Sequence, residues 1–487
     1  MRILGAVATV LFLLFSISCF NSNKGTNKVG IDQEINGYLT EAMELYTIPG
    51  LALAVIEGNN LVYENYFGKA SIEDNTLVDN KTIFRVFSTT KLITTTAVFQ
   101  LIEDGKLKLE DSISKYLEGL PTEWQDVKIK NLLSHSSGLP DFIRYKNTLS
   151  DKELMEKLYR DKMQFKTGHQ HSYNQTNYWL LAQIIEKITS TPFDDYVRNN
   201  QFDGSRNGVL FSSNALEVIP KRATRYVFSR KTQELIKHTS NDGVRGHSGN
   251  GLNISLTKFV EWDKKLKTNK LLSENTKSQM WSPFKFANRF AYQKDDFLHG
   301  WGLYYVNNLE SYGFSGGNVA AYRYFPGSKT TIILLSNGYQ TPAFDIIIND
   351  IARITIPELR AKKSTLEAEV MKLVMNHQLD EASQSLKVLN EENPNTKFDN
   401  LKWNINGFGN SYAWNEEFDK GFEIFKLNAH TYPDWWVSIS ALAESFDQQK
   451  DTLNAIRNYE RSVKLNEKNE YDYNEQMIKR AKELKNQ

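Results

Sequence analysis

Two pairs of strand-like stretches stand far apart in the chain. Residues 51–56 and 61–66 are rich in apolar and aromatic side chains, and the EGNN between them has the composition of a hairpin turn. Residues 319–325 and 330–335 form a second pair, joined by PGSK. We expect the two pairs to meet in one antiparallel sheet, because each pair alone has too little partner surface to bury its apolar face.

Helical patterns fill the sequence between these pairs. Residues 92–103 and 178–188 repeat apolar side chains at the spacing of a helix face. Helices packed around an antiparallel sheet make an α+β fold, so the pattern predicts an α+β domain at 31–358.

The character of the chain changes in the tail at 359–487, which has helical periodicity and repeats itself. GFEIF at 421–425 recurs as AIRNY at 455–459, and Tyr412 recurs as Phe446, in each case 34 residues later. This is the period of the tetratricopeptide repeat, in which helix hairpins bury their apolar faces against one another. The tail is therefore expected to be an all-α, tetratricopeptide-like region that can bind a protein partner.

A weaker hairpin at 366–393 precedes these units, and a capping helix at 471–485 follows them. An unrelated helical bundle remains the alternative, because two clear units are fewer than the three that an array usually needs. Four large apolar side chains are too many to be solvent-exposed, so some of them must pack between repeats or against the first domain: Trp403, Phe408, Trp435 and Trp436. The change in composition favours a tail that is independent of the first domain.

The N-terminus has the pattern of a secretory signal. Arg2 precedes an apolar run at 3–17, which is shorter than the roughly 20 residues of a membrane span but suits a signal-peptide core. We expect residues 1–19 to be a signal peptide and residues 20–30, rich in Asn and Lys, to be a flexible tether.

A cysteine ends the apolar segment. SISC at 16–19 resembles the bacterial lipobox, with Ser16 where leucine is usual, and Cys19 is the single cysteine of the chain. We expect Cys19 to be lipidated and the protein to be an exported cell-envelope lipoprotein, periplasm-facing or in the outer membrane. The alternative is a plain signal peptide with an incidental cysteine, and then a secreted or periplasmic protein.

Length and charge narrow the class of protein. The 487 residues exceed the roughly 250–300 that one core supports, so at least two domains are expected. The formal net charge is +1, with 59 basic and 58 acidic residues. This balance lacks the basic excess of a nucleic-acid-binding protein and favours a small-molecule or peptide substrate.

An S-x-x-K motif opens the helical pattern at 92–103. Ser88 and Lys91 are three residues apart, so on a helix the Lys91 ammonium lies on the same face as the Ser88 hydroxyl. The positive field at the helix N-terminus favours a developing alkoxide. By itself the motif is weak, because an ordinary helical turn with a solvated lysine has the same pattern.

Further motifs follow one another in order along residues 31–337. They are IPG at 48–50, IFRVFSTTK at 83–91, LIEDGKLKLED at 101–111, LLSHSSGLP at 132–140, YNQTNY at 173–178, GL at 251–252 and GWG at 300–302. Together they resemble the landmarks of serine β-lactamase-related and penicillin-binding-protein-like hydrolases, including esterases of the class C β-lactamase type. The resemblance implies a β-lactamase/transpeptidase-like domain and a serine hydrolase.

The resemblance also implies roles for individual residues. Ser88 attacks a carbonyl and forms an acyl-enzyme, while Tyr173 and Lys91 accept and return the proton, with Lys91 favouring the Tyr173 phenolate. The N–H groups of Ser88 and Gly317 form the oxyanion hole.

Two motifs depart from the family pattern. Gln175 replaces the asparagine of the second motif, so its hydrogen bond to substrate or to Lys91 must be repositioned. The third motif, usually Lys-Thr-Gly or His-x-Gly, is Phe314-Ser315-Gly316, which lacks the cation that binds a substrate carboxylate. We take these four residues as substrate-binding. Unless Arg323 replaces the cation, an ester or an amide without that carboxylate is favoured over a β-lactam.

Other candidate residues give weaker evidence for a catalytic or metal-binding role. The G-x-S-x-G sequence at 313–317 precedes a strand, whereas a nucleophile elbow needs a helix there, so Ser315 is not expected to be the nucleophile. His169 and His171 have no third ligand at metal spacing, and His135 is expected to brace a turn. We therefore expect no metal and no cofactor.

Two competing functions remain open from the sequence. Gln175, Phe314 and the repeat tail would suit a catalytically weak or inactive homologue that serves as a binding or scaffold module. A cell-envelope location would suit a peptidoglycan-directed D-aminopeptidase or carboxypeptidase, which the missing cation at Phe314 disfavours.

Overall fold

A seven-stranded antiparallel sheet is the centre of the computed structural model, which describes residues 22–229, 231–286, 297–392, 399–467 and 473–486. The strand order is β3-β2-β1-β12-β11-β10-β9. The strands are β1 (Gly50–Glu57), β2 (Asn60–Ser71), β3 (Thr76–Leu77), β9 (Gly302–Val306), β10 (Leu309–Gly316), β11 (Ala320–Phe325) and β12 (Thr330–Ser336). β1 pairs with β12, which places Leu53 opposite Leu334. The prediction that strands from both ends of the segment meet in one sheet is confirmed.

Both faces of the sheet are covered. In β1, Ala52 and Ala54 belong to the hydrophobic core on one face, and Leu51 and Leu53 belong to the core on the other. An apolar side chain at every position is what a strand needs when neither face meets water. The domain therefore has three layers, with helices on each side of the sheet.

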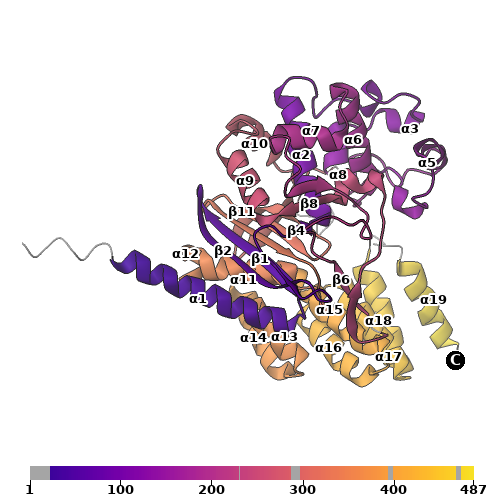
Figure 1. Cartoon of the computed structure of the whole chain (residues 1–487). Coiled ribbons are helices and arrows are strands. Elements are labelled where there is room, and N and C mark those ends of the chain that lie inside the picture. Colours follow the sequence, from indigo (N-terminus) through magenta and orange to yellow (C-terminus); the bar gives the residue numbers. More distant parts are fainter. Residues whose placement is uncertain (1–21, 230, 287–296, 393–398, 468–472, 487) are drawn as a thin grey trace, which may run out of the picture.

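The helices on the first face form the upper lobe of Figure 1 together with a three-stranded sheet, whereas a separate two-stranded sheet lies lower in the view. They are α2 (Thr90–Glu103), α3 (Thr122–Gln125), α4 (Ile129–Leu133), α5 (Asp151–Leu158), α6 (Gln175–Thr189), α7 (Phe193–Gln201), α8 (His247–Asn250), α9 (Leu256–Lys267) and α10 (Glu274–Met280). The small sheets contain β4 (Ile83–Arg85), β5 (Val209–Phe211), β6 (Tyr226–Ser229), β7 (Glu234–Lys237) and β8 (Leu252–Ser255). α2 is buried almost throughout, so its polar N-terminal residues lie inside the molecule.

Helix α1 (Ser22–Leu45) covers the second face together with α11 (Phe344–Thr355) and α12 (Pro357–Arg360). Ile35, Leu39 and Ala42 are spaced along one face of α1 and are buried. Of the flexible tether expected at 20–30, residues 20 and 21 lie outside the described ranges, and the rest lies in this helix, which begins at Ser22. Once the buried residues fix part of a helix, extending it by further turns costs little.

The tail is helical, as predicted. It contains α13 (Glu367–Met375), α14 (Leu379–Glu392), α15 (Asp399–Trp414), α16 (Phe418–Thr431), α17 (Trp436–Gln448), α18 (Thr452–Leu465) and α19 (Tyr473–Lys485). The repeated segments at 421–425 and 455–459 lie on α16 and α18, and successive helices pack against each other from α15 to α19. Trp403 and Trp435 meet edge to face, with ring centroids 4.7 Å apart.

The expectation that this tail is independent of the first domain is wrong. Met371 of α13, Ile405 of α15 and Ile424 of α16 belong to the same core as α11 and the sheet. The last three helices have a separate core, built around Trp436 and Tyr459. Composition did not reveal this because the docking surface uses the same apolar residue types as packing between repeats.

A buried polar network joins the two parts of the chain. Asp350 of α11 accepts hydrogen bonds from the backbone N–H groups of Glu367 (2.8 Å) and Ala368 (2.9 Å), and so caps the first turn of α13. Arg353 pairs with both Asp350 and Glu367, each at 2.8 Å. The tail helix thus begins on a side chain of the first domain.

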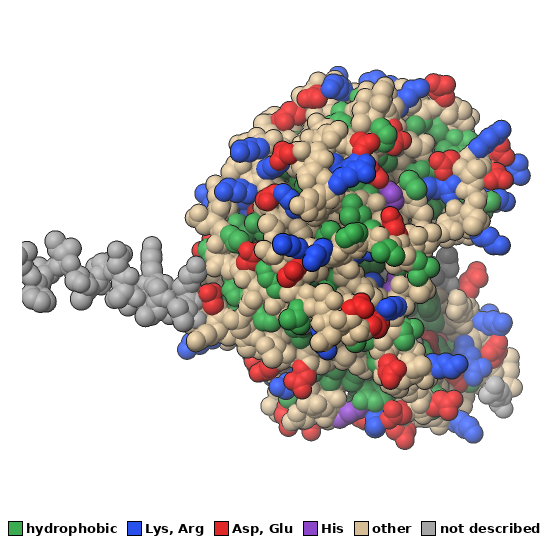
Figure 2. Space-filling model, viewed as in Figure 1, with side chains coloured by type: hydrophobic (Ala, Val, Ile, Leu, Met, Phe, Trp, Pro, Cys, Tyr) green, Lys and Arg blue, Asp and Glu red, His purple; other side chains and the backbone are tan. Residues whose placement is uncertain are grey.

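Figure 2 shows basic and acidic side chains interspersed over the visible face, in keeping with the near-zero net charge. The predicted signal peptide and Cys19 lie outside the described residues. Within the described ranges, no helix has both the length and the apolar character to cross a bilayer.

Candidate active site

Ser88 lies in a tight turn between β4 and α2. The turn is a 3-10 helix, η1 (Phe87–Thr89), and Phe87 has a φ of +45°. A bulky residue in the left-handed region is costly, and such strain is found mainly where the surrounding structure enforces it. Here it holds Ser88 at the entrance of the buried helix.

The end of β10 lies directly against this turn. A Cβ atom on Gly316 would come within 2.8 Å of the Ser88 backbone nitrogen, and one on Gly317 would come within 2.8 Å of the Phe87 ring. Gly317 also has a φ of +55°. Both positions therefore require glycine. The absence of a side chain at both lets the third motif lie beside the nucleophile.

Lys91 is fully buried in the first turn of α2. Its Nζ donates to Gln175 Oε1 at 3.1 Å and to the Gly249 carbonyl at 2.8 Å, and it lies 4.8 Å from the centre of the Tyr173 ring. Burial lowers the pKa of Lys91 to about 7, although the Asp141 carboxylate opposes part of this shift. A lysine with this pKa can serve as a base near neutral pH.

Tyr173 bridges to the nucleophile, because its hydroxyl donates to Ser88 Oγ at 2.8 Å. Burial among aromatic rings raises its pKa, while the Ser88 hydrogen bond lowers it only in part. The ring is 42% exposed, so solvent limits the size of this shift. The direction nevertheless contradicts the expected phenolate: Tyr173 stays protonated, and Lys91 is the residue poised to hold the proton.

The structure thus brings four predicted site residues together: Ser88, Lys91, Tyr173 and Gln175. The longer side chain of Gln175 keeps the hydrogen bond to Lys91, as expected. Phe314 is 6% exposed and packs near Tyr173, with ring centroids 6.4 Å apart. The missing cation is therefore replaced by an aromatic wall.

The Ser315 side chain points away from the Phe314 ring and toward the first turn of α11. Its Oγ donates to Asp345 Oδ1 at 2.5 Å and accepts from Arg323 Nη2 at 2.8 Å. Arg323, which sequence analysis considered as the substitute cation, is 1% exposed and pairs with Asp345. It is not a free cation for a substrate carboxylate.

A model of the beta-lactamase family matches residues 35–355, which include the sheet and the layers of helices on both faces. The chain belongs to the beta-lactamase family. It is therefore a serine hydrolase that acts through an acyl-enzyme, as the sequence motifs imply.

Relatives and solved structures agree with this assignment. Penicillin-binding protein 4* of Bacillus subtilis (strain 168) is 26% identical over 322 residues, which cover 60% of this chain and 69% of the relative. The octameric penicillin-binding protein homologue from Pyrococcus abyssi has a TM-score of 0.57 at 22% identity, covering 66% of this chain and 76% of its own. The D-amino acid amidase from Ochrobactrum anthropi SV3 has a TM-score of 0.53 at 18% identity, covering 68% and 99%.

His135 of the β-lactamase domain lies beneath Tyr173, with ring centroids 4.4 Å apart. Its Nδ1 accepts the Asn174 N–H at 3.1 Å, which fixes the backbone next to Tyr173. Burial lowers the pKa of His135 well below its usual value, so the ring is neutral. His171 is partly buried, with its ring centre 5.8 Å from that of His135, and no group of three or more His, Cys, Asp or Glu side chains within the described ranges is arranged to hold a metal.

Sequence reasoning missed several residues of the site in the β-lactamase domain. Gly249 accepts from Lys91, Asp141 modulates its charge, and Asp345 holds Arg323. Arg225 donates to the Gly317 carbonyl at 3.4 Å. None of them stands in a recognisable motif, and only the glycine pair 249 and 251 near a turn could have been a signal.

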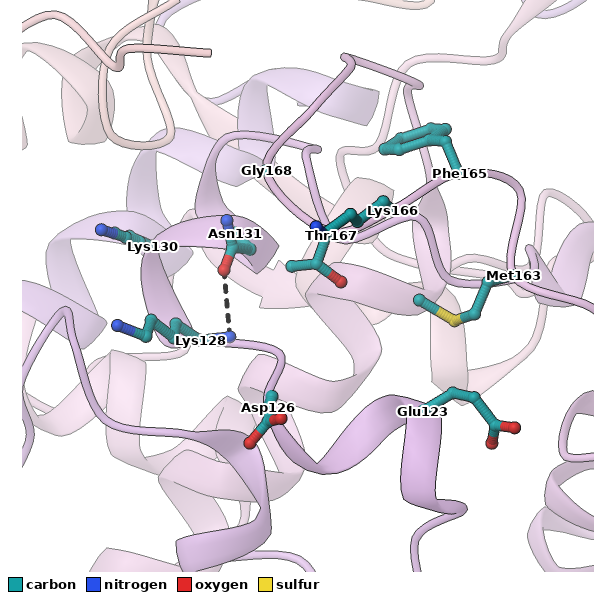
Figure 3. A pocket seen from close by; sticks show the side chains of 10 residues that line it. All are labelled: Glu123, Asp126, Lys128, Lys130, Asn131, Met163, Phe165, Lys166, Thr167 and Gly168. Carbon is teal, nitrogen blue, oxygen red and sulfur yellow. Dashed lines mark hydrogen bonds between the residues drawn. The ribbon is translucent and has the colours of Figure 1, made fainter. Parts of the chain in front are cut away.

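A large open hollow of about 710 Å³ lies elsewhere on the lobe, between residues 123–131 and 163–168. Figure 3 shows Lys128, Lys130, Asp126 and Glu123 around it, with Asn131 accepting from the Lys128 N–H. Its mixed charges and the absence of Ser88 from its lining separate it from the catalytic site.

Proposed function

We propose that this chain hydrolyses an ester or a small amide whose leaving group lacks a carboxylate. The observation that carries the proposal is the contrast between the two halves of the site. The Ser88, Lys91 and Tyr173 side chains are assembled for acyl transfer, whereas Phe314 and the paired Arg323 offer no free cation.

The proposed reaction starts with neutral Lys91, which takes the proton as Ser88 Oγ attacks the carbonyl carbon. The N–H groups of Ser88 and Gly317 stabilise the oxyanion; the close approach of β10 to the turn supports this pairing. Tyr173, protonated and 2.8 Å from Ser88 Oγ, gives its proton to the leaving alcohol or amine and regains one from Lys91, which is then neutral again. Water then attacks the acyl-enzyme, with Lys91 again as the base.

A small amide is the second candidate substrate. The fold neighbour from Ochrobactrum anthropi is described as a D-amino acid amidase, and a relative from Escherichia coli O157:H7 as a putative D-alanyl-D-alanine carboxypeptidase. A carboxypeptidase substrate carries a carboxylate on its leaving group. The third motif, with the neutral Ser315, does not favour the binding of that carboxylate. The assembled Ser88 site also argues against an inactive scaffold.

The test combines labelling with turnover. The purified protein is treated with a fluorophosphonate and then assayed on p-nitrophenyl butyrate, amino acid amides and a chromogenic β-lactam. We expect Ser88-dependent labelling and turnover of the ester or the amide, but not of the β-lactam. No labelling of folded protein would support the scaffold, and hydrolysis of the β-lactam alone would overturn the proposed substrate class.

For localisation, we propose an exported lipoprotein anchored through Cys19. For the tail, we propose helices that form a tetratricopeptide-like surface for a protein partner. The apolar run before Cys19 and the 34-residue repeat support this proposal. Metabolic labelling with a palmitate analogue tests it: wild type should incorporate label and Cys19→Ser should not. Equal labelling of both would remove the anchor from the proposal.

A further inference from the structure

A closed cluster of polar side chains lies behind the third motif. It comprises Ser315 and Arg323 on adjacent strands, Tyr304 on β9, and Asp345 in the first turn of α11. The Arg323 guanidinium carbon lies 3.5 Å from the centre of the Tyr304 ring, and its Nη2 donates to both Ser315 and Asp345. No part of the proposed reaction uses these residues.

The Ser315 hydroxyl has no hydrogen left to donate to a ligand. A hydroxyl has one proton and two lone pairs. The Ser315 hydroxyl donates its hydrogen bond to Asp345, and one of its lone pairs accepts a hydrogen bond from Arg323. What Ser315 can still offer to a ligand is a single lone pair, so it presents an acceptor.

The charges of the cluster also disfavour a carboxylate on the ligand. Arg323 is enclosed at 1% exposure, and its ion pair with Asp345 neutralises it, whereas the Asp345 side chain is 23% exposed. The part of the pair that solvent and a ligand can reach is the carboxylate. A carboxylate on the ligand would meet an acceptor and a negative charge.

The cluster borders the side of the cleft where a leaving group departs. Ser315 lies between Phe314, whose ring centre is 6.4 Å from that of Tyr173, and Gly316, which lies against the Ser88 turn. Tyr173 is the proton donor to Ser88, and a leaving group must depart beside its proton donor.

We infer that Asp345 determines the specificity for the leaving group. Because Asp345 accepts the hydrogen bond of the Ser315 hydroxyl and neutralises Arg323, the site rejects carboxylated leaving groups and accepts those that carry an N–H or ammonium donor. This inference rests on the proposed function. The substrate class becomes esters or amides with a neutral or cationic leaving group. Asp345 acts through Ser315 and Arg323 and is not a catalytic residue.

Three esters of one N-acylglycine test the inference with the full chain: phenyl, 3-carboxyphenyl and 3-(aminomethyl)phenyl. In wild type, kcat/KM should fall in the order aminomethyl, phenyl, carboxyl. In Asp345→Asn the ratio of the carboxyl to the aminomethyl ester should rise at least about tenfold, because Ser315 regains a proton to donate and Arg323 its charge. Glu310→Gln, which removes an exposed carboxylate at the far end of β10, should leave the ratio unchanged.

An unchanged ratio in folded Asp345→Asn would overturn the inference. If that variant fails to fold, Arg323→Gln tests the same pair in reverse and should shift the ratio about tenfold toward the aminomethyl ester. If wild type turns over no ester and fluorophosphonate does not label Ser88, the proposed function fails by itself. Binding of 3-hydroxybenzoate then decides the inference: Asp345→Asn should bind it more tightly than wild type, and equal binding would reject it.

Discussion

One buried lysine sets the proton chemistry of the site. The hydrogen-bond partners of Lys91 are the neutral Gln175 side chain and the Gly249 carbonyl, two aromatic rings lie beside its ammonium, and the Asp141 carboxylate acts on it through its charge alone. These neutral groups replace water incompletely, which is why its pKa falls to about 7. A base with this pKa is half neutral at the pH where Tyr173 remains fully protonated.

The paired action of Ser88 and Lys91 gives the first prediction. Ser88→Ala and Lys91→Ala should each remove nearly all ester turnover, and the double variant should be no worse than either, because the two side chains act as a unit. Lys106→Ala, which removes an exposed lysine just beyond the same helix, is the control. A Lys91→Ala enzyme that kept more than about a tenth of the rate, a cost under about 1.4 kcal/mol, would rule out Lys91 as the base.

The second prediction concerns pH. Because neutral Lys91 is the active form, kcat/KM should rise with pH through a midpoint near 7. The Asp141 carboxylate raises the pKa of Lys91, so Asp141→Asn should move this midpoint to lower pH. Asp126→Asn, on the surface of the same lobe, should leave it in place. A midpoint that Asp141→Asn moves upward or not at all would contradict this electrostatic account.

At the scale of elements, the site depends on how closely α8 approaches α2 and α6. A Cβ atom on Gly249 would lie 2.5 Å from Gln175 Oε1 and 3.4 Å from Lys91 Nζ. The third prediction is that Gly249→Ala displaces Gln175 and lowers kcat/KM about tenfold or more, since misplacement of catalytic groups is costly. Gly327→Ala, in a turn with open space around its Cβ, serves as the control. Equal activity of the two variants would mean that Gln175 does not position Lys91.

The junction of α11 and α13 gives the fourth prediction. Burial and the neighbouring Asp350 raise the pKa of Glu367 from 4.5 to about 7, although Arg353 opposes the shift. The folded chain therefore keeps this proton at pH values where the unfolded chain has lost it. Stability should decline as pH rises from about 4.5 to about 7.

Denaturant titrations across this range measure the decline, and Glu367→Gln should flatten it. Glu369→Gln, an exposed glutamate on the same helix, should keep the wild-type slope. A rise in the stability of wild type over this interval that Glu367→Gln abolishes would show that the sign is wrong.

For the molecule as a whole, the tail divides into a docked part and a peripheral part. Helices α13 to α16 share a core with α11 and the sheet, whereas α17 to α19 have a small core of their own. The fifth prediction is that a chain ending at Pro433 stays soluble and keeps its ester turnover. A chain ending at Arg360 should aggregate or melt at a clearly lower temperature, because it exposes the apolar surface that α13 covers.

Light scattering and thermal melting distinguish the two truncations. If the chain ending at Arg360 were as stable and active as the full chain, the docking contacts would contribute little. If the chain ending at Pro433 were folded but inactive, the last three helices would be required to complete the active site.

The sequence by itself determined the features that depend on local pattern. Ser88 and Lys91 are three residues apart, so any helix there places them on one face, and the apolar strand runs could be buried only within a sheet. The helices of the tail, with their 34-residue spacing, were likewise predictable. Short-range geometry fixes such features regardless of what packs on them.

Only the tertiary structure decided features that depend on encounters between distant residues. The burial of Lys91, and hence its base-like pKa, requires Gly249 and Gln175 to close around it. Arg323 loses its role as a free cation because Asp345 pairs with it from another element. Whether a side chain is solvated, paired or enclosed depends on its neighbours in space, and the one-dimensional pattern does not specify those neighbours.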